Sequence, residues 1–169
     1  MSAETITTAL FLITAVVASA VLINAVYPVI STMAGTFSST THESDVRIRT
    51  DFKIIATYAS SGSPGTAQVW MKNIGSEQIS ISDIQRADVF GGATDSFEHL
   101  AHTNVTPVMN QWTETFTNPE YNLNNNQFWD PGETVKVSFK TTIPSTGSKV
   151  YFQFALPDGI WRSTEFTVS

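Results

Sequence analysis

The chain begins with a long apolar stretch. From Thr5 to Thr41 no side chain is charged, and residues 6–30 (ITTALFLITAVVASAVLINAVYPVI) are apolar on every face of a helix. At a rise of about 1.5 Å per residue, about 20 such residues cross the hydrocarbon core of a bilayer. The pattern predicts an N-terminal helix over residues 1–30, placed in a membrane or in the core of a helical filament.

A signal peptide and a buried core helix both fit this stretch less well. A signal peptide has a basic start and a shorter apolar run, whereas residues 1–5 contain neither Lys nor Arg. A buried core helix usually keeps a polar stripe, which residues 6–30 lack.

The helix also has features of a packing surface. Ala15 and Ser19 form a pair of small residues four positions apart, a spacing that lets helix backbones approach closely in lipid. Alanine and serine are common in any membrane helix, so an isolated span is the alternative. The predicted helix-packing residues are Leu10, Ala15, Ala18, Ser19 and Leu22.

A Ser/Thr-rich linker is predicted over residues 31–44 (STMAGTFSSTTHES), either helical for a turn or two or a flexible stalk. From Val46 the hydrophobic period changes to two, which is typical of a half-buried strand over residues 46–58. The change predicts a separate β domain over residues 45–169.

Further strands are predicted in that domain by alternation and by turn residues between the runs. The last two form a hairpin around Pro157-Asp158-Gly159, with Phe152 and Phe154 on its buried face. Short strands at this spacing predict an all-β fold, an immunoglobulin-like β-sandwich preceded by one long hydrophobic helix. The other predicted strands are residues 67–73, 78–84, 86–90, 108–116 and 134–141.

Composition excludes several classes of function. The net charge of −6 and the absence of basic runs argue against nucleic-acid binding, which needs clustered Lys and Arg. The chain has no cysteine, which excludes disulfides, thiolate metal sites and cysteine nucleophiles.

No residue pattern predicts catalysis, a cofactor or a metal site. His99 and His102 are expected in a loop, and no metal-binding helix motif accompanies them. The loop at residues 118–133 (NPEYNLNNNQFWDPGE) is rich in oxygen ligands that suit calcium, but its spacing differs from that of an EF-hand. A solvated turn is the preferred interpretation of this loop. An enzyme tethered by its helix has no supporting motif.

Four surface positions are candidates for interaction or modification. Trp70, Tyr151 and Trp161 are predicted interface residues, because bulky aromatics are natural docking elements, although each could simply cover the core. Asn104 begins an N-x-Thr glycosylation sequence (Asn104-Val105-Thr106).

The charges around the helix conflict with an external β domain. Arg47, Arg49 and Lys53 follow the helix, and the positive-inside rule alone would place them in the cytoplasm. We still expect the domain outside, because these residues belong to a predicted folded strand and alternate with acidic residues (Glu43, Asp45 and Asp51).

The whole chain resembles the G-type stator accessory proteins of the archaellum, the archaeal flagellum, and the related archaellins. The similar segments are the tail without a basic start (MSAETITTALFLITAVVASAVLI), the Ser/Thr-rich stalk, and the amphipathic strand VRIRTDFKII. They also include the Lys-Asn-x-Gly turn in VWMKNIGSEQISISDI, the turn in WDPGETVKVSF, and the C-terminal FALPDGIWRSTEFTV.

The resemblance implies a membrane-anchored, non-enzymatic protein of the motility machinery. Its β domain would lie under the S-layer, associate with itself and with the F-type accessory protein, and hold the rotary motor against the envelope. The S-layer and membrane lipid are further expected partners. The alternative is an archaellin or type IV pilin-like subunit that polymerises through its helix. Such subunits normally carry a basic residue and a glycine before the apolar run, and this sequence shows none there.

Overall fold

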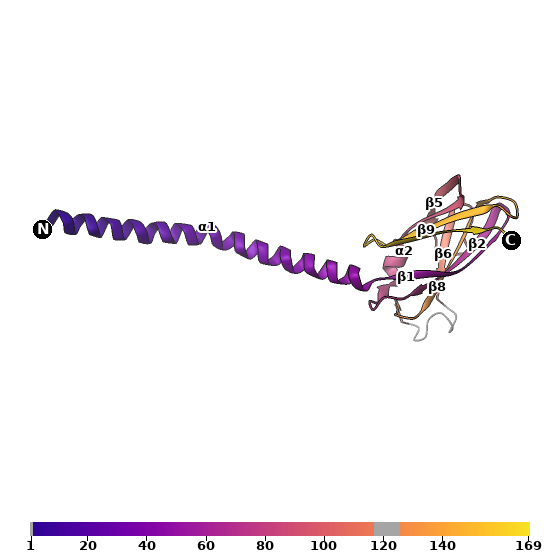
Figure 1. Cartoon of the computed structure of the whole chain (residues 1–169), viewed down its shortest axis with the longest axis horizontal. Coiled ribbons are helices and arrows are strands. Elements are labelled where there is room, and N and C mark those ends of the chain that lie inside the picture. The colour runs from indigo at the N-terminus through magenta and orange to yellow at the C-terminus, as the bar shows by residue number, and fades with distance from the viewer. Residues whose placement is uncertain (1, 117–125) are drawn as a thin grey trace. The chain divides into compact units, whose positions relative to one another are not determined.

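A computed structural model describes residues 2–116 and 126–169 of the chain. It divides into two compact units, Met1–Asp45 and Val46–Ser169. Figure 1 shows one long helix and a set of strands. The elements are α1 (Ser2–Arg49), β1 (Phe52–Ser60), β2 (Gly62–Asn73), β3 (Ile79–Ser80), α2 (Ile81–Gln85), β4 (Asp88–Ala93), β5 (Ser96–His102), β6 (Gln111–Thr115), β7 (Phe128–Trp129), β8 (Thr134–Ile143), β9 (Lys149–Ala155) and β10 (Trp161–Thr167).

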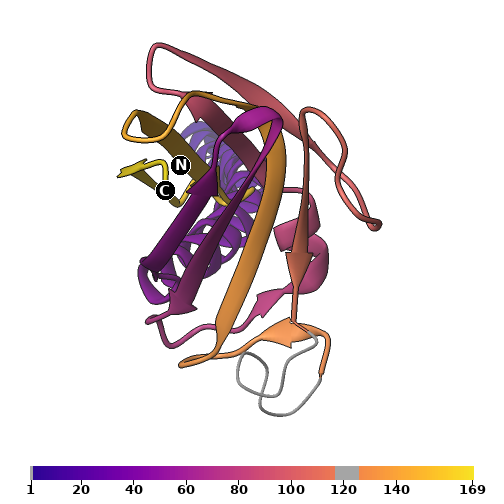
Figure 2. The same cartoon turned by 90° about the vertical axis from the view of Figure 1, so that its right-hand side faces the viewer.

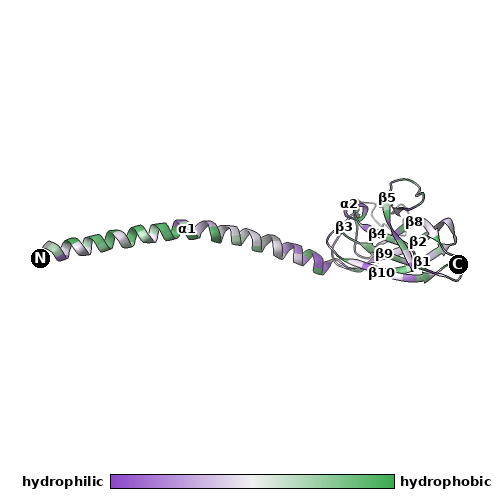
Figure 3. Cartoon of the chain, turned by 90° about the horizontal axis from the view of Figure 1, so that it is seen from above, coloured by the Kyte–Doolittle hydropathy of each residue, from purple (hydrophilic) through white to green (hydrophobic). Residues whose placement is uncertain are grey.

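Helix α1 is apolar in its first half and polar toward its end (Figure 3). By length and composition it can span a membrane. Side chains along its apolar run are exposed, including all five predicted packing residues. Their role in helix packing remains a prediction. The exposed packing positions are Leu10, Ala15, Ala18, Ser19 and Leu22.

The Ser/Thr-rich segment over residues 31–44 is helical throughout, well beyond the turn or two that the sequence suggested. Several of its hydroxyls donate to the carbonyl four residues earlier: Thr32 to Pro28 at 2.9 Å, and Thr41 to Phe37 at 2.7 Å. Such bonds satisfy the hydroxyls within the helix and make Ser and Thr compatible with it.

The prediction of a strand beginning at Val46 is wrong. Residues 46–49 form the last turn of α1, and β1 begins at Phe52. Alternation placed Ile48 inside, whereas it is 83% exposed. The helix persists because the Thr50 hydroxyl donates to the Val46 carbonyl at 2.8 Å and because a loop caps the helix end, as described below.

The β domain is a sandwich formed by one folded-over sheet of eight strands, with β3 and β7 paired in a separate two-stranded sheet, which confirms the predicted class. The strand order is β1-β2-β8-β6-β5-β4-β9-β10, and only the β5–β6 pair is parallel. Figure 2 shows β1, β2 and β8 side by side. The two halves, β1-β2-β8-β6 and β5-β4-β9-β10, face each other across the core, and the Ser169 amide donates to the Ala59 carbonyl at 2.9 Å.

Aromatic side chains fill the core between the two halves. The Phe52 ring on β1 meets the Phe154 ring on β9 edge-on, with centroids 5.6 Å apart. Phe139 on β8 stacks on Phe152, also at 5.6 Å. All four are fully buried, so the predicted inward face of β9 is confirmed.

Two local predictions differ from the structure. The predicted strand at residues 78–84 is the short strand β3 followed by α2, because the Ser80 hydroxyl caps the helix by accepting from the Asp83 amide at 3.1 Å. The strand predicted over residues 86–90 instead runs through Gly91 and Gly92 as part of β4, which pairs with both β5 and β9.

We expect a fragment of residues 43–169 to fold without the apolar helix, because its core is complete within Val46–Ser169. Circular dichroism of the purified fragment should show a β-type spectrum and a cooperative melt. A disordered fragment would contradict the independence of the β domain.

In that fragment, Phe152→Ala or Phe154→Ala should lower the free energy of unfolding by about 3–5 kcal/mol, through lost burial and a residual cavity. Urea unfolding measures the change. The control is Phe97→Ala, whose ring is 48% exposed, which should cost far less. A loss below about 1 kcal/mol at both buried positions would mean that this pair contributes little to the core.

Candidate functional site

The histidines do not converge on a shared site. Both His99 and His102 lie in strand β5, not in the predicted loop, and their odd spacing directs them to opposite faces. His99 pairs with Asp88 at 3.2 Å, and His102 with Glu114 at 2.6 Å. Within residues 2–116 and 126–169, no group of three or more His, Cys, Asp or Glu side chains could hold a metal ion.

The oxygen-rich loop lies partly outside the described residues, which exclude 117–125. Its described acids bond to protein donors. Asp130 accepts from Gln78 at 2.6 Å and from Asn126 at 2.9 Å, and Glu133 accepts from the Asp130 amide at 3.0 Å. These bonds hold the predicted Asp130-Pro131-Gly132-Glu133 turn.

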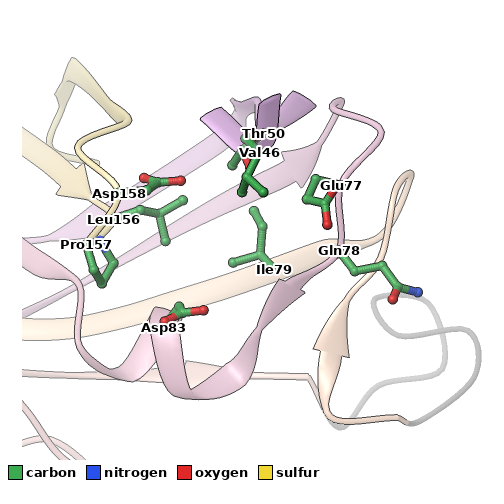
Figure 4. Close-up of a pocket in the computed structure, with 9 residues that line it drawn as sticks. All are labelled: Val46, Thr50, Glu77, Gln78, Ile79, Asp83, Leu156, Pro157 and Asp158. Carbon is green, nitrogen blue, oxygen red and sulfur yellow. Dashed lines mark hydrogen bonds between the residues drawn. The ribbon is translucent and has the colours of Figure 1, made fainter. Parts of the chain in front are cut away.

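A small cleft of about 160 Å³ opens beside the last turn of α1. Figure 4 shows Glu77, Asp83 and Asp158 around it, with apolar side chains between them. The Ser80 hydroxyl bonds Asp83 and holds the pKa of that carboxyl below its usual value, assisted by Arg86 and opposed by burial. Asp83 therefore stabilises the start of α2 at neutral pH, and this contribution is lost as the pH falls through its folded pKa.

The Lys-Asn-x-Gly turn closes the end of α1. The backbone amides of Ser76 and Glu77 donate to the Arg49 carbonyl at 2.9 and 3.3 Å, and the Gly75 amide donates to the Asp51 carbonyl at 2.9 Å. These bonds satisfy carbonyls that a helix end leaves without partners. The turn is thus the cap of the helix within the unit Val46–Ser169.

Asn73 organises this turn from a fully buried position. Its side-chain amide donates to the carbonyls of Glu77 and Trp129, both at 2.9 Å, and its oxygen accepts from the Gly75 amide at 2.9 Å. Gly75 is required by space, because a Cβ there would lie 2.3 Å from the Arg49 oxygen.

Aromatic rings, some exposed and some half-buried, lie on the outer face of the half β5-β4-β9-β10. Strand register places Phe97 opposite Gly92, which is itself opposite Tyr151. Because Gly92 has no side chain, the two rings meet over it with centroids 4.6 Å apart. We call this surface the aromatic face; its rings are Phe90, Phe97, His99, Tyr151 and Trp161.

The outer face of the other half, β1-β2-β8-β6, is basic. In β8, for example, Val137 and Phe139 point into the core, so the residues that alternate with them point outward. The only carboxylate in these four strands, Glu114, lies opposite inward Val137 and bonds His102. We call this surface the lysine face; it carries Lys53, Lys72, Lys136 and Lys140 around Trp70.

The predicted interface residues therefore separate onto two surfaces. Tyr151 and Trp161 lie on the aromatic face, where Trp161 is 55% exposed, and half-buried Trp70 lies on the lysine face. Asn104 is exposed in the turn after β5. Sequence reasoning missed Phe90 and Phe97, because the predicted strand ended at residue 90 and the pairing of β4 with β5 is not visible in the hydrophobic pattern.

This chain is similar to known proteins over most of its length. A family model described as archaeal-type flagellin matches residues 2–166. An uncharacterized protein of Archaeoglobus fulgidus is 26% identical over 139 residues, which are 82% of this chain and 80% of that protein.

Three solved structures share the fold. The archaellum periplasmic stator protein FlaG from Sulfolobus acidocaldarius is 22% identical, with a TM-score of 0.50, and the match covers 69% of this chain and 99% of that chain. A structure of the stator complex of FlaF and FlaG from the same organism matches at 22% identity and a TM-score of 0.50, over 68% and 87%. The archaeal flagellum of Methanospirillum hungatei matches at 19% identity and a TM-score of 0.53, over 91% and 90%.

The geometry of the helix cap predicts the effect of a side chain at Gly75. In the fragment of residues 43–169, Gly75→Ala should cost about 1–3 kcal/mol, since the new methyl group meets the Arg49 carbonyl. Urea unfolding measures the loss, with Ile74→Ala at the exposed neighbouring position as the control. Equal stabilities for the two variants would contradict the tight fit at Gly75.

Proposed function

Because the chain belongs to the archaeal-type flagellin family, and is an archaellum component related to the stator protein FlaG and to the archaellum filament, we propose that it is a membrane-anchored stator subunit. In this role α1 holds the chain in the cell membrane. The β domain lies outside the membrane and associates there with further copies.

The observation that carries this proposal is the separation of the chain into an uncovered apolar helix and a self-contained β domain. The apolar run of α1 has no buried side chains, so it needs lipid or other helices around it. The β domain has its own core and exposes rings on a sheet face, which suits protein contacts.

An external β domain is compatible with the basic residues after the helix. Arg47 and Arg49 lie in the last turn of α1, 17 and 19 residues beyond Ile30. The positive-inside rule applies within about 15–20 residues of a span, so these arginines lie at its limit. We place the domain under the S-layer, where Asn104 would be accessible to glycosylation.

The partners follow from the relatives. The complex of FlaF and FlaG in Sulfolobus acidocaldarius supports an F-type accessory protein as a partner of this chain. The S-layer and membrane lipid are further proposed contacts. The family and its structural neighbours are structural archaellum proteins, which supports a non-enzymatic role for the chain.

A filament subunit is the second candidate. The observation in its favour is that the Methanospirillum hungatei filament match covers 91% of this chain, a share that must include much of α1. In that role the helices would pack against one another in a shared core, and the β domains would contribute less to assembly.

The two candidates differ in where association occurs. For a stator subunit we expect the fragment of residues 43–169 to self-associate weakly, with a Kd of roughly 0.1–1 mM by sedimentation equilibrium. Electron microscopy of the full chain in detergent should show limited assemblies. A strictly monomeric fragment, together with long filaments of the full chain, would identify the filament subunit instead.

A further inference from the structure

The two outer faces of the β-sandwich carry different charge. The lysine face has four of the five lysines of the chain and no outward carboxylate in its strands, although the chain as a whole carries −6. None of the four makes an ion pair within residues 2–116 and 126–169. The acidic side chains that the structure describes therefore lie outside the outward positions of these four strands.

The aromatic face has the opposite character. Its strands place Asp88 and Glu165 outward, and their single outward lysine, Lys149, already pairs with Glu165 at 3.4 Å. Asp88 is exposed beside His99 at 3.2 Å. The face thus carries two outward carboxylates to one outward lysine around a centre of aromatic rings.

We propose that the aromatic face of one copy stacks on the lysine face of the next copy, so that β domains assemble head to tail. The inference rests on the proposed self-association of the β domain and names the two surfaces that meet. Charge complementarity favours a second copy as the occupant, because an identical domain offers a basic partner for each acidic face.

Both faces also supply aromatic side chains to such a contact. Trp70 stands among the lysines, opposite Ala56 on β1 and Lys136 on β8. On the other face, Phe97 projects with 48% of its surface exposed. A ring packed at the centre with paired charges around it is the usual anatomy of a specific protein interface.

The expected contact is small and weak. Four strands about 4.8 Å apart, with five residues along each at about 3.3 Å, give a footprint of roughly 300 Å². A standard interface buries about 800 Å² on each partner. Because the two surfaces differ, the contact is heterologous, and it extends into an open or ring-shaped array unless its geometry closes on two copies.

The test uses the full chain in detergent micelles, with α1 unchanged in every variant. Lys136→Glu damages the lysine face, and Phe97→Lys damages the aromatic face. In sedimentation equilibrium at low salt, with the chain at roughly 1 mM to exceed the expected Kd, we expect wild type to form species larger than a dimer, and each variant alone to bind itself at least tenfold more weakly. An equal mixture should form dimers and nothing larger, because each variant keeps the face that the other lacks.

Two control variants add charge away from both faces, at exposed loop positions: Ser145→Glu and Val105→Lys. Both should assemble as wild type does. Circular dichroism melts check folding, and Lys140→Glu replaces Lys136→Glu if the latter unfolds.

The remaining outcomes separate the hypotheses. If Phe97→Lys prevents assembly while both lysine variants assemble within twofold of wild type, the aromatic faces pair with each other and the head-to-tail inference is wrong. If all the variants assemble like wild type, the helices carry association. A wild-type chain that stays monomeric would instead overturn the proposed self-association itself.

Discussion

The structure depends on one constraint: within the part of the chain that the structure describes, the apolar side chains of α1 are exposed. Fourteen large hydrophobic side chains between Ile6 and Ile30 are exposed. At about 1.5–3 kcal/mol each, exposing them to water would cost roughly 20–40 kcal/mol, which exceeds the whole stability of a typical domain. The helix must therefore lie in lipid or among other helices, and the rest of the chain must fold without it.

That requirement explains how the β domain is built. Strands β2, β8 and β9 alternate regularly between buried and outward residues, and the core is closed by Phe52, Phe139, Phe152 and Phe154 from facing halves. This alternation leaves every second residue outward, so the outward residues are free to differ between the two halves. One half carries lysines there and the other carries rings and acids, and this difference gives the domain two distinct faces.

Features set by the local spacing of hydrophobic residues could be predicted from the sequence. Features set by contacts between segments far apart in the chain could not. The apolar run, the β-sandwich class and the inward face of β9 followed from hydrophobic spacing alone. The end of α1 did not, because residues 46–49 alternate like a strand and become helical through bonds to a loop more than 25 residues later. Nor could the faces be assigned, since Tyr151 and Trp70 are both outward residues of strands, and only the strand order places them on different halves.

If α1 is anchored in a membrane as proposed, a weak contact between β domains is adequate for assembly. Chains anchored in one membrane share a thin layer of space, and linkage of this kind raises the effective concentration of one domain around the next to the millimolar range. A footprint of roughly 300 Å², too small to hold free domains together at low concentration, then suffices for an assembly at the membrane. In the proposed stator role, anchoring and stacking would be complementary: the apolar helix would supply concentration without specificity, and the two faces would supply direction. In a filament subunit the roles of helix and β domain would differ. Packed helices would supply both the free energy and the geometry of assembly, and the opposed charge of the two faces would have no part in it.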